Sequence, residues 1–460
     1  MRRTLADIVG DGHLIVDRDA LDPYGHDETP GLSPQLPDAV VRPADRAQVA
    51  AVLRACSEAG VFVTPRGGGT GHSGGCVAVQ GGVVLDLSRL NRILDLSNGD
   101  LTVDLQPGVI LQDLHHAVED AGLFYPPDPN SLESCTLGGN VAENAGGPRA
   151  VRYGVTRDYV LGLEVVLATG EVLRIGRRTS KGVSGYDLAG LIVGSEGTLA
   201  VITEITLKLV PSPRQVATAL VTFDDAATAA RAVAQVLGKG ILPRTLEYMD
   251  GRSIDAVRPQ ALFPIPEGID AALLVETDGD DEESTLAQLG RAVEILETAG
   301  ARSSLVAQHE GQRRDLWATR RKLTEATRAL RRHKIAEDIA VPRSKIPEAL
   351  ARVYAIGERH GILTAAYGHA GDGNLHVQVL FDDAERDGPA VQRVLDEVMH
   401  LAIALGGTLS GEHGIGCAKK RFMPLEHGPL SLDLMRRMKR AWDPAGILNP
   451  GKIFPDDSGD

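Results

Sequence analysis

The stretch PRGGGTGHSGG, residues 65–75, decides the fold because it is the densest part of a glycine excess. The chain has 52 glycines in 460 residues, about 11% against a usual share of about 7%. Half of them, 26, fall in the windows 67–82, 138–154, 182–197, 368–373 and 406–416. Each glycine loses more backbone freedom on folding than any other residue. Glycine concentrated in this way predicts backbone that approaches a ligand or another segment closely.

This stretch contains a GxGxxG pattern at 69–74, which is typical of Rossmann dinucleotide sites when it opens a helix. Here it leads into CVAVQGGVVLDL, residues 76–87, which reads as a strand. The context therefore favours an anion nest, in which successive backbone N–H groups converge on a pyrophosphate. The side chains that would add donors are those of Arg66, Thr70 and Ser73.

Around this loop, helices and strands mix without regular alternation, which predicts an α+β fold rather than a doubly wound sheet. We expect helices over 46–59, ended by Gly60, and over 110–121. We expect strands at 61–65, 81–87 and 199–211, and hairpins at 92–105 and 161–175. In the first hairpin, Asn98-Gly99 should supply the positive φ angles of the turn.

Pro211-Ser212-Pro213 marks a domain boundary, which predicts domains over 1–212 and 213–412 and a C-terminal segment, 413–460, that returns to the first. The second domain begins with strands and helices in the order βαββαβ, the ferredoxin-like arrangement. These elements are expected at 215–223, 224–237, 244–249, 271–277, 282–299 and 302–307. A helix (311–332), a strand (335–341), a helix (345–360), a hairpin (364–381) and a helix (386–405) should follow.

Composition excludes several classes of protein. A hydrophobic share of 43% is too high for a disordered chain. The net charge of −14 argues against a nucleic-acid or anionic-membrane partner. No run approaches 18 apolar residues and the N-terminus has no signal-peptide core, so we expect a cytoplasmic chain without a membrane span. The cysteines form no CxxC pair, which suits a reducing compartment; they are Cys56, Cys76, Cys135 and Cys417.

Further motifs follow in order: PPDPNSLESCTLGGNVAENAGG (126–147), RYGVTRDYVLGLEVVLATGEVL (152–173), GSEGTLAVITEITLKLVP (194–211), YGHAGDGNLH (367–376), SGEHGIG (410–416) and DPAGILNPGKIF (443–454). With the first glycine loop, they resemble the vanillyl-alcohol-oxidase-type (PCMH-type) FAD-binding flavoproteins. The closest resemblance is to the FAD-linked D-2-hydroxy-acid dehydrogenase branch, which includes D-lactate and D-2-hydroxyglutarate dehydrogenases and the glycolate oxidase FAD subunit.

The resemblance implies a two-subdomain FAD-binding domain and a substrate (cap) domain built on a ferredoxin-like antiparallel sheet. It places the FAD pyrophosphate against Arg66, Gly67, Gly68, Gly69, Thr70, Gly71, His72, Ser73 and Gly74. It places the path to the isoalloxazine along Pro127, Ser134, Gly138, Gly139, Asn144, Gly146 and Gly147. Gly197 and Ile202 would support the adenine end, and Asn449 the turn near the ring. Some relatives attach FAD to a histidine where this chain has Thr70, so non-covalent FAD is expected, with His72 as the neighbouring alternative.

A second set of residues suits a divalent metal. His369 and His376 lie on either side of an Asp372-Gly373 turn, and a tight hairpin would point both imidazoles at one centre. A single such histidine is more typical of a hydrogen-bonded core, but the pair together with Glu412 forms a divalent-metal set for Zn²⁺ or Mn²⁺. In extended backbone the next side chain, His413, points the other way. We therefore expect His413 to be the general base.

Arg320 and Thr324 are four residues apart on a helix, and Lys334 follows at its end. A solvated basic helix face would explain these residues equally well, but the resemblance implies that they bind the substrate carboxylate. Gln378 stands where D-2-hydroxyglutarate-type members tend to carry Asn, one methylene shorter.

The expected reaction is oxidation of a D-2-hydroxy acid to the 2-oxo acid, with hydride passing from C2 to flavin N5 and electrons then to a quinone or an electron-transfer protein. A flavin oxidase, an alkyl-transfer enzyme on the same fold, or an FAD subunit of a larger glycolate-oxidase-type complex are the alternatives. A homodimer is compatible with the sequence.

Overall fold

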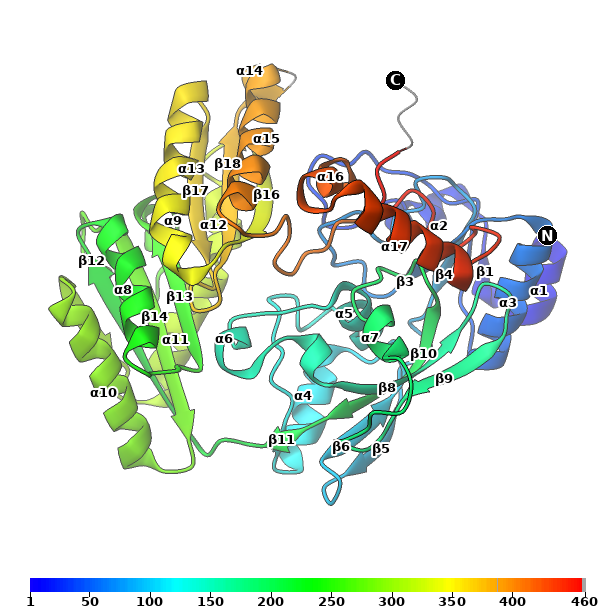
Figure 1. The fold of residues 1–460 in the computed structure, drawn as a ribbon, viewed down its shortest axis with the longest axis horizontal. Helices are drawn as coiled ribbons and strands as arrows, with labels where there is room; N and C mark the ends of the chain where they lie inside the picture. The colour runs from blue at the N-terminus through cyan, green and yellow to red at the C-terminus, as the bar shows by residue number, and fades with distance from the viewer. Residues whose placement is uncertain (387, 457–460) are drawn as a thin grey trace. The chain divides into compact units, whose positions relative to one another are not determined.

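The computed structural model describes residues 1–386 and 388–456, and the chain forms two compact units (Figure 1). Unit 1 is assembled from Met1–Ala145, Val155–Ser212 and the segment that begins at Glu412. Unit 2 comprises Gly146–Gly154 and Pro213–Gly411. The last four residues of the expected C-terminal segment, 457–460, lie outside the described residues.

Unit 1 contains a four-stranded sheet in the order β1 (Leu14–Ile15), β2 (Ala39–Val41), β4 (Val83–Asp86) and β3 (Val63–Arg66). Strands β2, β4 and β3 are parallel. Helix α3 (Arg46–Ala59) begins at Asp45, whose side chain accepts the Gln48 N–H, and ends at Gly60 with φ 63°, as expected. Its apolar face packs with α1 (Arg2–Val9) on the sheet, around Val49, Leu53 and Leu85.

The second sheet of unit 1 is antiparallel, in the order β5 (Ile93–Ser97), β6 (Thr102–Leu105), β10 (Val201–Lys208), β8 (Val160–Val166) and β9 (Val172–Gly176). Both expected hairpins are present, but the turn of the first spans residues 98–101. The positive φ falls on Leu101, at 54°, and the expectation for Asn98-Gly99 is wrong. A longer loop does not need two left-handed residues at its centre.

The remaining elements of unit 1 are short, apart from two helices. Strands β7 (Leu123–Phe124) and β11 (Val210–Pro211) pair with each other. The helices are α2 (Arg18–Leu21), α4 (Leu111–Asp120), α5 (Leu137–Glu143), α7 (Leu188–Ile192), α16 (Met423–Glu426) and α17 (Pro429–Trp442).

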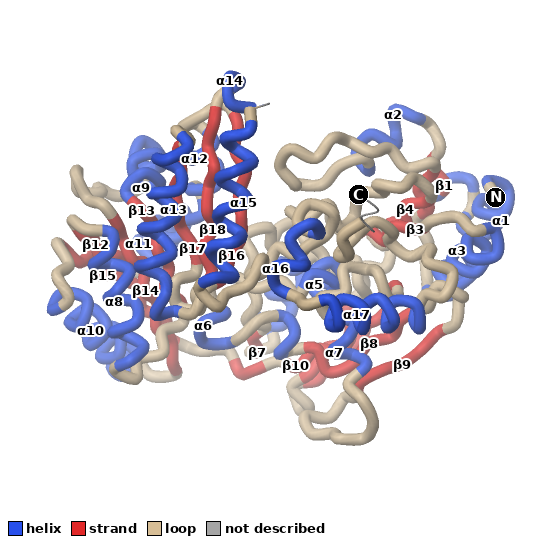
Figure 2. Tube along the Cα trace, turned by 45° about the horizontal axis from the view of Figure 1, so that its top comes forward, coloured by secondary structure: helices blue, strands red, loops and turns tan. Residues whose placement is uncertain are grey.

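Unit 2 is built on a seven-stranded sheet, whose strands are red in Figure 2. All neighbouring strands of this sheet are antiparallel. Its order is β15 (Ser303–Val306), β12 (Gln215–Phe223), β14 (Ala271–Gly279), β13 (Thr245–Asp250), β17 (Leu363–Gly368), β18 (Asn374–Phe381) and β16 (His333–Ala340). The first four strands have the order 4-1-3-2 of a ferredoxin-like sheet, which confirms that expectation. Three further strands extend this sheet beyond β13.

Helices α8 (Ala226–Gly238), α10 (Glu282–Thr298), α13 (Ile346–His360) and α15 (Pro389–Ala404) form a packed layer on the sheet. Helices α9 (Gly251–Val257), α11 (Glu310–Arg321) and α12 (Leu323–Arg328) cover a core around Leu220, Met249 and Leu274. The expected single helix over 311–332 is wrong, because the chain breaks at Lys322 into α11 and α12. Short helices α6 (Ala150–Tyr153) and α14 (Asp383–Arg386) complete the unit. Within the described parts of the chain, we find no helix with the length and apolarity that a membrane crossing requires.

Candidate active site

The first glycine loop packs backbone against backbone on the segment before α5. A Cβ added to Gly67 would lie 2.3 Å from Thr136 Oγ1, and one added to Gly68 would lie 2.3 Å from the carbonyl oxygen of Ser134. Gly69, with φ +72°, adopts the left-handed conformation that glycine tolerates. The first two glycine clusters therefore form one continuous wall inside unit 1.

Arg66 points out of this loop. Its guanidinium donates to the carbonyl oxygens of His26 (2.9 Å) and Pro23 (3.0 Å) and lies over the Tyr24 ring. These contacts tie the N-terminal segment to the loop, so the backbone N–H groups of the glycines are the better candidates to hold a phosphate.

The other expected pyrophosphate residues lie on the same loop. His72 Nδ1 is 3.2 Å from the carbonyl oxygen of Glu28. Gly74, with φ +73°, leaves no room for a side chain because a Cβ would lie 2.4 Å from Cys417 Sγ. The Oγ of Ser73 is buried and has no hydrogen-bond partner among the described residues. Thr70 and Gly71 complete the loop and are partly buried.

The second cluster is fixed by caps at both ends of α5. Thr136 Oγ1 accepts the Gly139 N–H at the start, and Asn144, with φ 58°, ends the helix. The Asn144 side-chain oxygen accepts the Arg157 N–H at 2.9 Å. A Cβ on Gly138 would lie 2.5 Å from Cβ of Pro107, so this first turn also requires glycine. Of the other expected residues, Pro127 accepts a hydrogen bond from His115 Nε2 through its carbonyl oxygen, at 3.1 Å. Ser134 lies against Gly68, and Gly146 and Gly147 begin the first segment of unit 2.

Asn449 closes the loop from the C-terminal side. Its Nδ2 donates to the carbonyl oxygens of Gly75 and Glu196, each at 2.7 Å. Its Oδ1 is buried and, among the described residues, has no hydrogen-bond partner. Gly197, with φ +67°, packs on Pro65, and Ile202 is buried in β10.

These features fit a dinucleotide cofactor. Several glycines stand where a side chain would collide, so their backbone N–H groups are not covered by side chains. The buried Ser73 Oγ and Asn449 Oδ1 have no hydrogen-bond partner among the described residues, and a polar cofactor would supply one.

Glu196 anchors the loop that carries Glu412 and His413. Its carboxylate accepts the N–H groups of Ile415 (2.8 Å) and Gly416 (2.6 Å). Burial raises the pKa of Glu196, and these backbone donors partly offset the rise. Glu196 itself has φ 51°, an uncommon conformation outside glycine. We did not expect this residue, because nothing in the local sequence shows that its carboxylate reaches residues 219 and 220 positions away.

The predicted histidine pair forms at the turn of the β17–β18 hairpin. The Nε2 atoms of His369 and His376 are 3.4 Å apart, and the ring planes are perpendicular. Both side chains are buried. Burial, with a smaller contribution from His369, lowers the pKa of His376 to about 3, so this imidazole is neutral at ordinary pH. Neutral imidazole is the form that binds a metal.

Glu247, on β13, is a further residue of this site that the sequence did not indicate. It is fully buried, and its Oε1 is 2.7 Å from His369 Nδ1. Its Oε2 accepts from Arg320 Nε at 3.0 Å and Nη2 at 2.6 Å. A carboxylate that accepts a hydrogen bond from Nδ1–H favours the tautomer of His369 whose Nε2 has the lone pair that can bind a metal.

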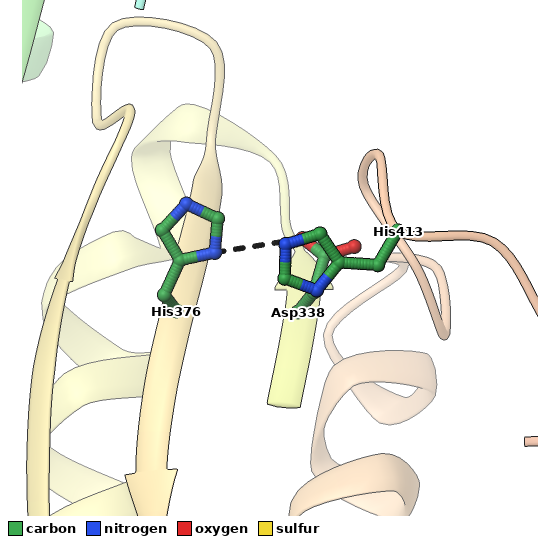
Figure 3. A group of neighbouring side chains, drawn as sticks. All are labelled: Asp338, His376 and His413. Atoms are coloured by element: carbon green, nitrogen blue, oxygen red, sulfur yellow. Dashed lines mark ion pairs between the residues drawn. The ribbon is translucent and has the colours of Figure 1, made fainter. Parts of the chain in front are cut away.

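Asp338, on β16, stands opposite His376 in the sheet register. The His376 Nδ1 is 3.9 Å from Asp338 Oδ1, the contact drawn as a dashed line in Figure 3. The other Asp338 oxygen accepts from Ser410 Oγ at 2.8 Å, and its backbone oxygen accepts the Gly411 N–H at 3.3 Å. The chain immediately before Glu412 is therefore held at this edge of the sheet.

Within unit 2, His369, His376 and Asp338 supply two imidazoles and one carboxylate, and Figure 3 shows His376 beside Asp338. Glu412 and His413, the other residues expected at a metal and as base, belong to unit 1. Imidazole and carboxylate groups fit Zn²⁺ or Mn²⁺ by donor type.

The expected substrate-binding residues gather around Tyr367 in unit 2. Arg320 lies over the Tyr367 ring, at 5.0 Å from its centroid, and Thr324 Oγ1 is 2.9 Å from the Tyr367 hydroxyl. Lys334 Nζ donates to the carbonyl oxygen of Thr324 at 2.8 Å. Gln378 is fully buried and donates to the carbonyl oxygen of His376 at 3.2 Å. The break between α11 and α12 thus does not separate Arg320 from Thr324.

Both halves of the chain match models of known protein families. Residues 37–176 match an FAD binding domain, and residues 212–453 match the C-terminal domain of FAD linked oxidases. The glycolate oxidase subunit GlcD of Bacillus subtilis is 40% identical over 436 residues, which cover 95% of this chain and 92% of that protein. The D-lactate dehydrogenase of Anaerostipes hadrus is 38% identical over 449 residues, covering 96% and 94%. That of Archaeoglobus fulgidus is 37% identical over 439 residues, covering 94% and 95%.

Solved structures share the fold at lower identity. A substrate-bound p-cresol methylhydroxylase has a TM-score of 0.80 at 18% identity, and the match covers 100% of this chain and 97% of that one. An alkyldihydroxyacetonephosphate synthase has a TM-score of 0.75 at 19% identity, covering 97% and 84%. These neighbours confirm the expected α+β, PCMH-type fold. With the family matches and close relatives, they establish that the chain belongs to the FAD-linked oxidases, as an FAD-dependent oxidoreductase of the GlcD and D-lactate dehydrogenase type.

Proposed function

We propose that this chain oxidises a D-2-hydroxy acid to the 2-oxo acid, using FAD and a divalent metal held by His369, His376 and Glu412. The observation that carries the proposal is the histidine pair of unit 2: two buried Nε2 atoms lie 3.4 Å apart, and the Glu247 carboxylate is 2.7 Å from Nδ1 of His369. The names of the relatives, glycolate oxidase subunit and D-lactate dehydrogenase, favour a small 2-hydroxy acid as the substrate.

The chain's own residues divide the chemistry between them. FAD supplies the acceptor for the hydride that leaves C2. The metal would lower the pKa of the substrate hydroxyl. His413 takes the hydroxyl proton, because it follows Glu412 directly and in extended backbone its imidazole points to the other side from that ligand. Glu196 fixes the loop of this base through the N–H groups of Ile415 and Gly416.

Anaerobic mixing of FAD-loaded, metal-loaded protein with a panel of 2-hydroxy acids tests the proposal. Flavin absorbance should bleach with at least one of D-lactate, glycolate, D-malate and D-2-hydroxyglutarate, and not with the L-enantiomers of the three chiral acids. Flavin that stays oxidised with the whole panel would contradict the proposed substrate class.

His413→Ala should retain FAD but lose flavin reduction by at least about a hundredfold, since general base catalysis typically contributes that much. The measurement is the anaerobic reduction rate at saturating substrate. The control is His309→Ala; His309 caps α11 in unit 2 through its Nδ1 and has no part in the site. A His413→Ala rate equal to that of the parent protein removes His413 from this role.

The name of the B. subtilis relative, a glycolate oxidase subunit, also supports a second candidate: an FAD subunit that acts only within a larger complex. Substrate-driven bleaching of the isolated chain distinguishes the two, because a chain that needs its partners stays oxidised alone. Rapid oxygen consumption would instead indicate an oxidase, and a quinone or an electron-transfer protein is the acceptor that we propose.

A further inference from the structure

The cation expected to bind substrate is already paired inside unit 2. Both Nε and Nη2 of Arg320 donate to Glu247 Oε2, at 3.0 and 2.6 Å. Both side chains are buried, Glu247 completely. Two donors converging on one carboxylate form a strong, charge-assisted pair that neutralises the guanidinium. Only Nη1 of Arg320 lies outside these contacts with Glu247.

Lys334, the second expected cation, is also engaged. Its Nζ donates to the carbonyl oxygen of Thr324 at 2.8 Å and to Thr327 Oγ1 at 3.4 Å, both in α12. These contacts engage two of the three donors of the ammonium group and tie Lys334 to α12.

The charge of this cluster limits which substrate it suits. The charges of Glu247 and Arg320 cancel, and the imidazole of His369 contacts the same carboxylate. The carboxylate next to the reacting hydroxyl of a 2-hydroxy acid would share the metal centre. A second, distal carboxylate would need a cation of its own, because burying an unpaired charge is costly.

We propose that Glu247, by pairing with Arg320, restricts the substrate to 2-hydroxy acids with a single carboxylate and disfavours 2-hydroxy dicarboxylates. This inference rests on the proposed function and names the substrate class within it. Glu247 acts through Arg320 and is a positioning residue that sets specificity; Arg320 contributes a hydrogen bond through Nη1 and carries no net charge to a distal carboxylate.

Binding of product-type ligands to the FAD-loaded, metal-loaded protein tests the inference without turnover. Isothermal titration should show pyruvate, with one carboxylate, binding at least about tenfold more tightly than 2-oxoglutarate, with two, because a lost charge-assisted contact is worth about that factor. Glu247→Gln keeps the shape and releases the charge of Arg320, so the preference should shift about tenfold or more toward 2-oxoglutarate. The same shift should appear in the ratio of kcat/KM values for D-lactate and D-2-hydroxyglutarate.

The matched control is Glu276→Gln. Glu276, on the neighbouring strand β14, is a buried carboxylate paired with Arg244 at 3.1 Å, away from His369. It should leave the ligand preference unchanged.

Two results overturn the inference: parent protein that binds 2-oxoglutarate as tightly as pyruvate, or folded Glu247→Gln with an unchanged preference. The first result is measured on the parent protein, so the inference can be tested even if Glu247→Gln fails to fold. A pyruvate preference that shifts as predicted, in protein whose flavin no 2-hydroxy acid reduces, would refute the proposed function and leave the specificity role of Glu247 intact.

Discussion

Lys334 lies where a charged ammonium group is costly, because burial, followed by the nearby Arg328, lowers its pKa to about 8 from the ordinary 10.5. Between these two values the unfolded chain binds more protons at this residue than the folded chain does. Stability must therefore rise with pH across this window as far as Lys334 is concerned. Because this contribution comes from one side chain, it can be measured as the difference in the free energy of unfolding between proteins with and without Lys334.

We predict that the free energy of unfolding of the parent protein, minus that of Lys334→Met, rises from pH 8 to pH 10.5 by on the order of 2 kcal/mol. Urea unfolding of both proteins at a series of pH values measures this difference. Lys322→Met, at the break between α11 and α12, is the control for removing a lysine from the same part of unit 2. If the difference for Lys334→Met does not change with pH, burial does not lower the pKa of Lys334.

Sequence reasoning found His369 and His376 because both flank one tight turn, so local spacing alone predicts that they meet. It did not find Glu247 because that residue reaches His369 across 122 positions of sequence. Glu247 sits in TLEYMD, which reads as an ordinary strand, and only the pairing of β13 with β17 brings it to the histidine. Arg320 was assigned from the family resemblance, since its spacing to Thr324 fits a solvated helix face equally well, and its partner Glu247 was not predicted.

At the scale of elements, the glycine loops owe their composition to two different constraints. Gly69 and Gly74 require positive φ, whereas Gly67 and Gly68 lack room for a Cβ. The close contacts of Gly67 and Gly68 join the loop after β3 to the start of α5. A substitution at one of these glycines therefore tests whether the cofactor needs both segments in contact.

We predict that Gly68→Ala releases FAD, since its Cβ would meet the Ser134 backbone oxygen at 2.3 Å and must displace one wall of the cradle. The FAD content of the purified variant, read from flavin absorbance, should fall at least severalfold. Gly99→Ala is the matched control, because that Cβ meets nothing within 4 Å. Full FAD occupancy in Gly68→Ala would show that the two segments separate without loss of the cofactor.

Helix boundaries were predictable where a capping residue marks them. Helix α3 has Asp45 and Gly60 at its ends and appears as expected. The segment 310–328 has no glycine or proline after Gly311, so its sequence does not predict the break at Lys322. The break follows the packing of Leu316 and Leu323 into the same core from two short helices, a tertiary effect.

At the scale of the whole molecule, the strand order of the ferredoxin-like part could be deduced because βαββαβ connectivity permits few arrangements. The addition of β17, β18 and β16 could not, since β16 precedes the hairpin in sequence yet lies outside it at the sheet edge. This arrangement places Asp338 opposite His376 and holds Gly411, the residue before Glu412. The metal set thus depends on strand order as well as on the hairpin.

The most direct test of a metal-assisted oxidation is anaerobic flavin reduction by D-lactate in metal-loaded protein and in protein depleted of metal with a chelator. The account predicts that both retain FAD, that the loaded protein bleaches, and that the depleted protein bleaches at least about a hundredfold more slowly, because the metal contributes several kcal/mol to such a step. Restoring Zn²⁺ or Mn²⁺ should restore the rate. Equal rates with and without metal would contradict the account.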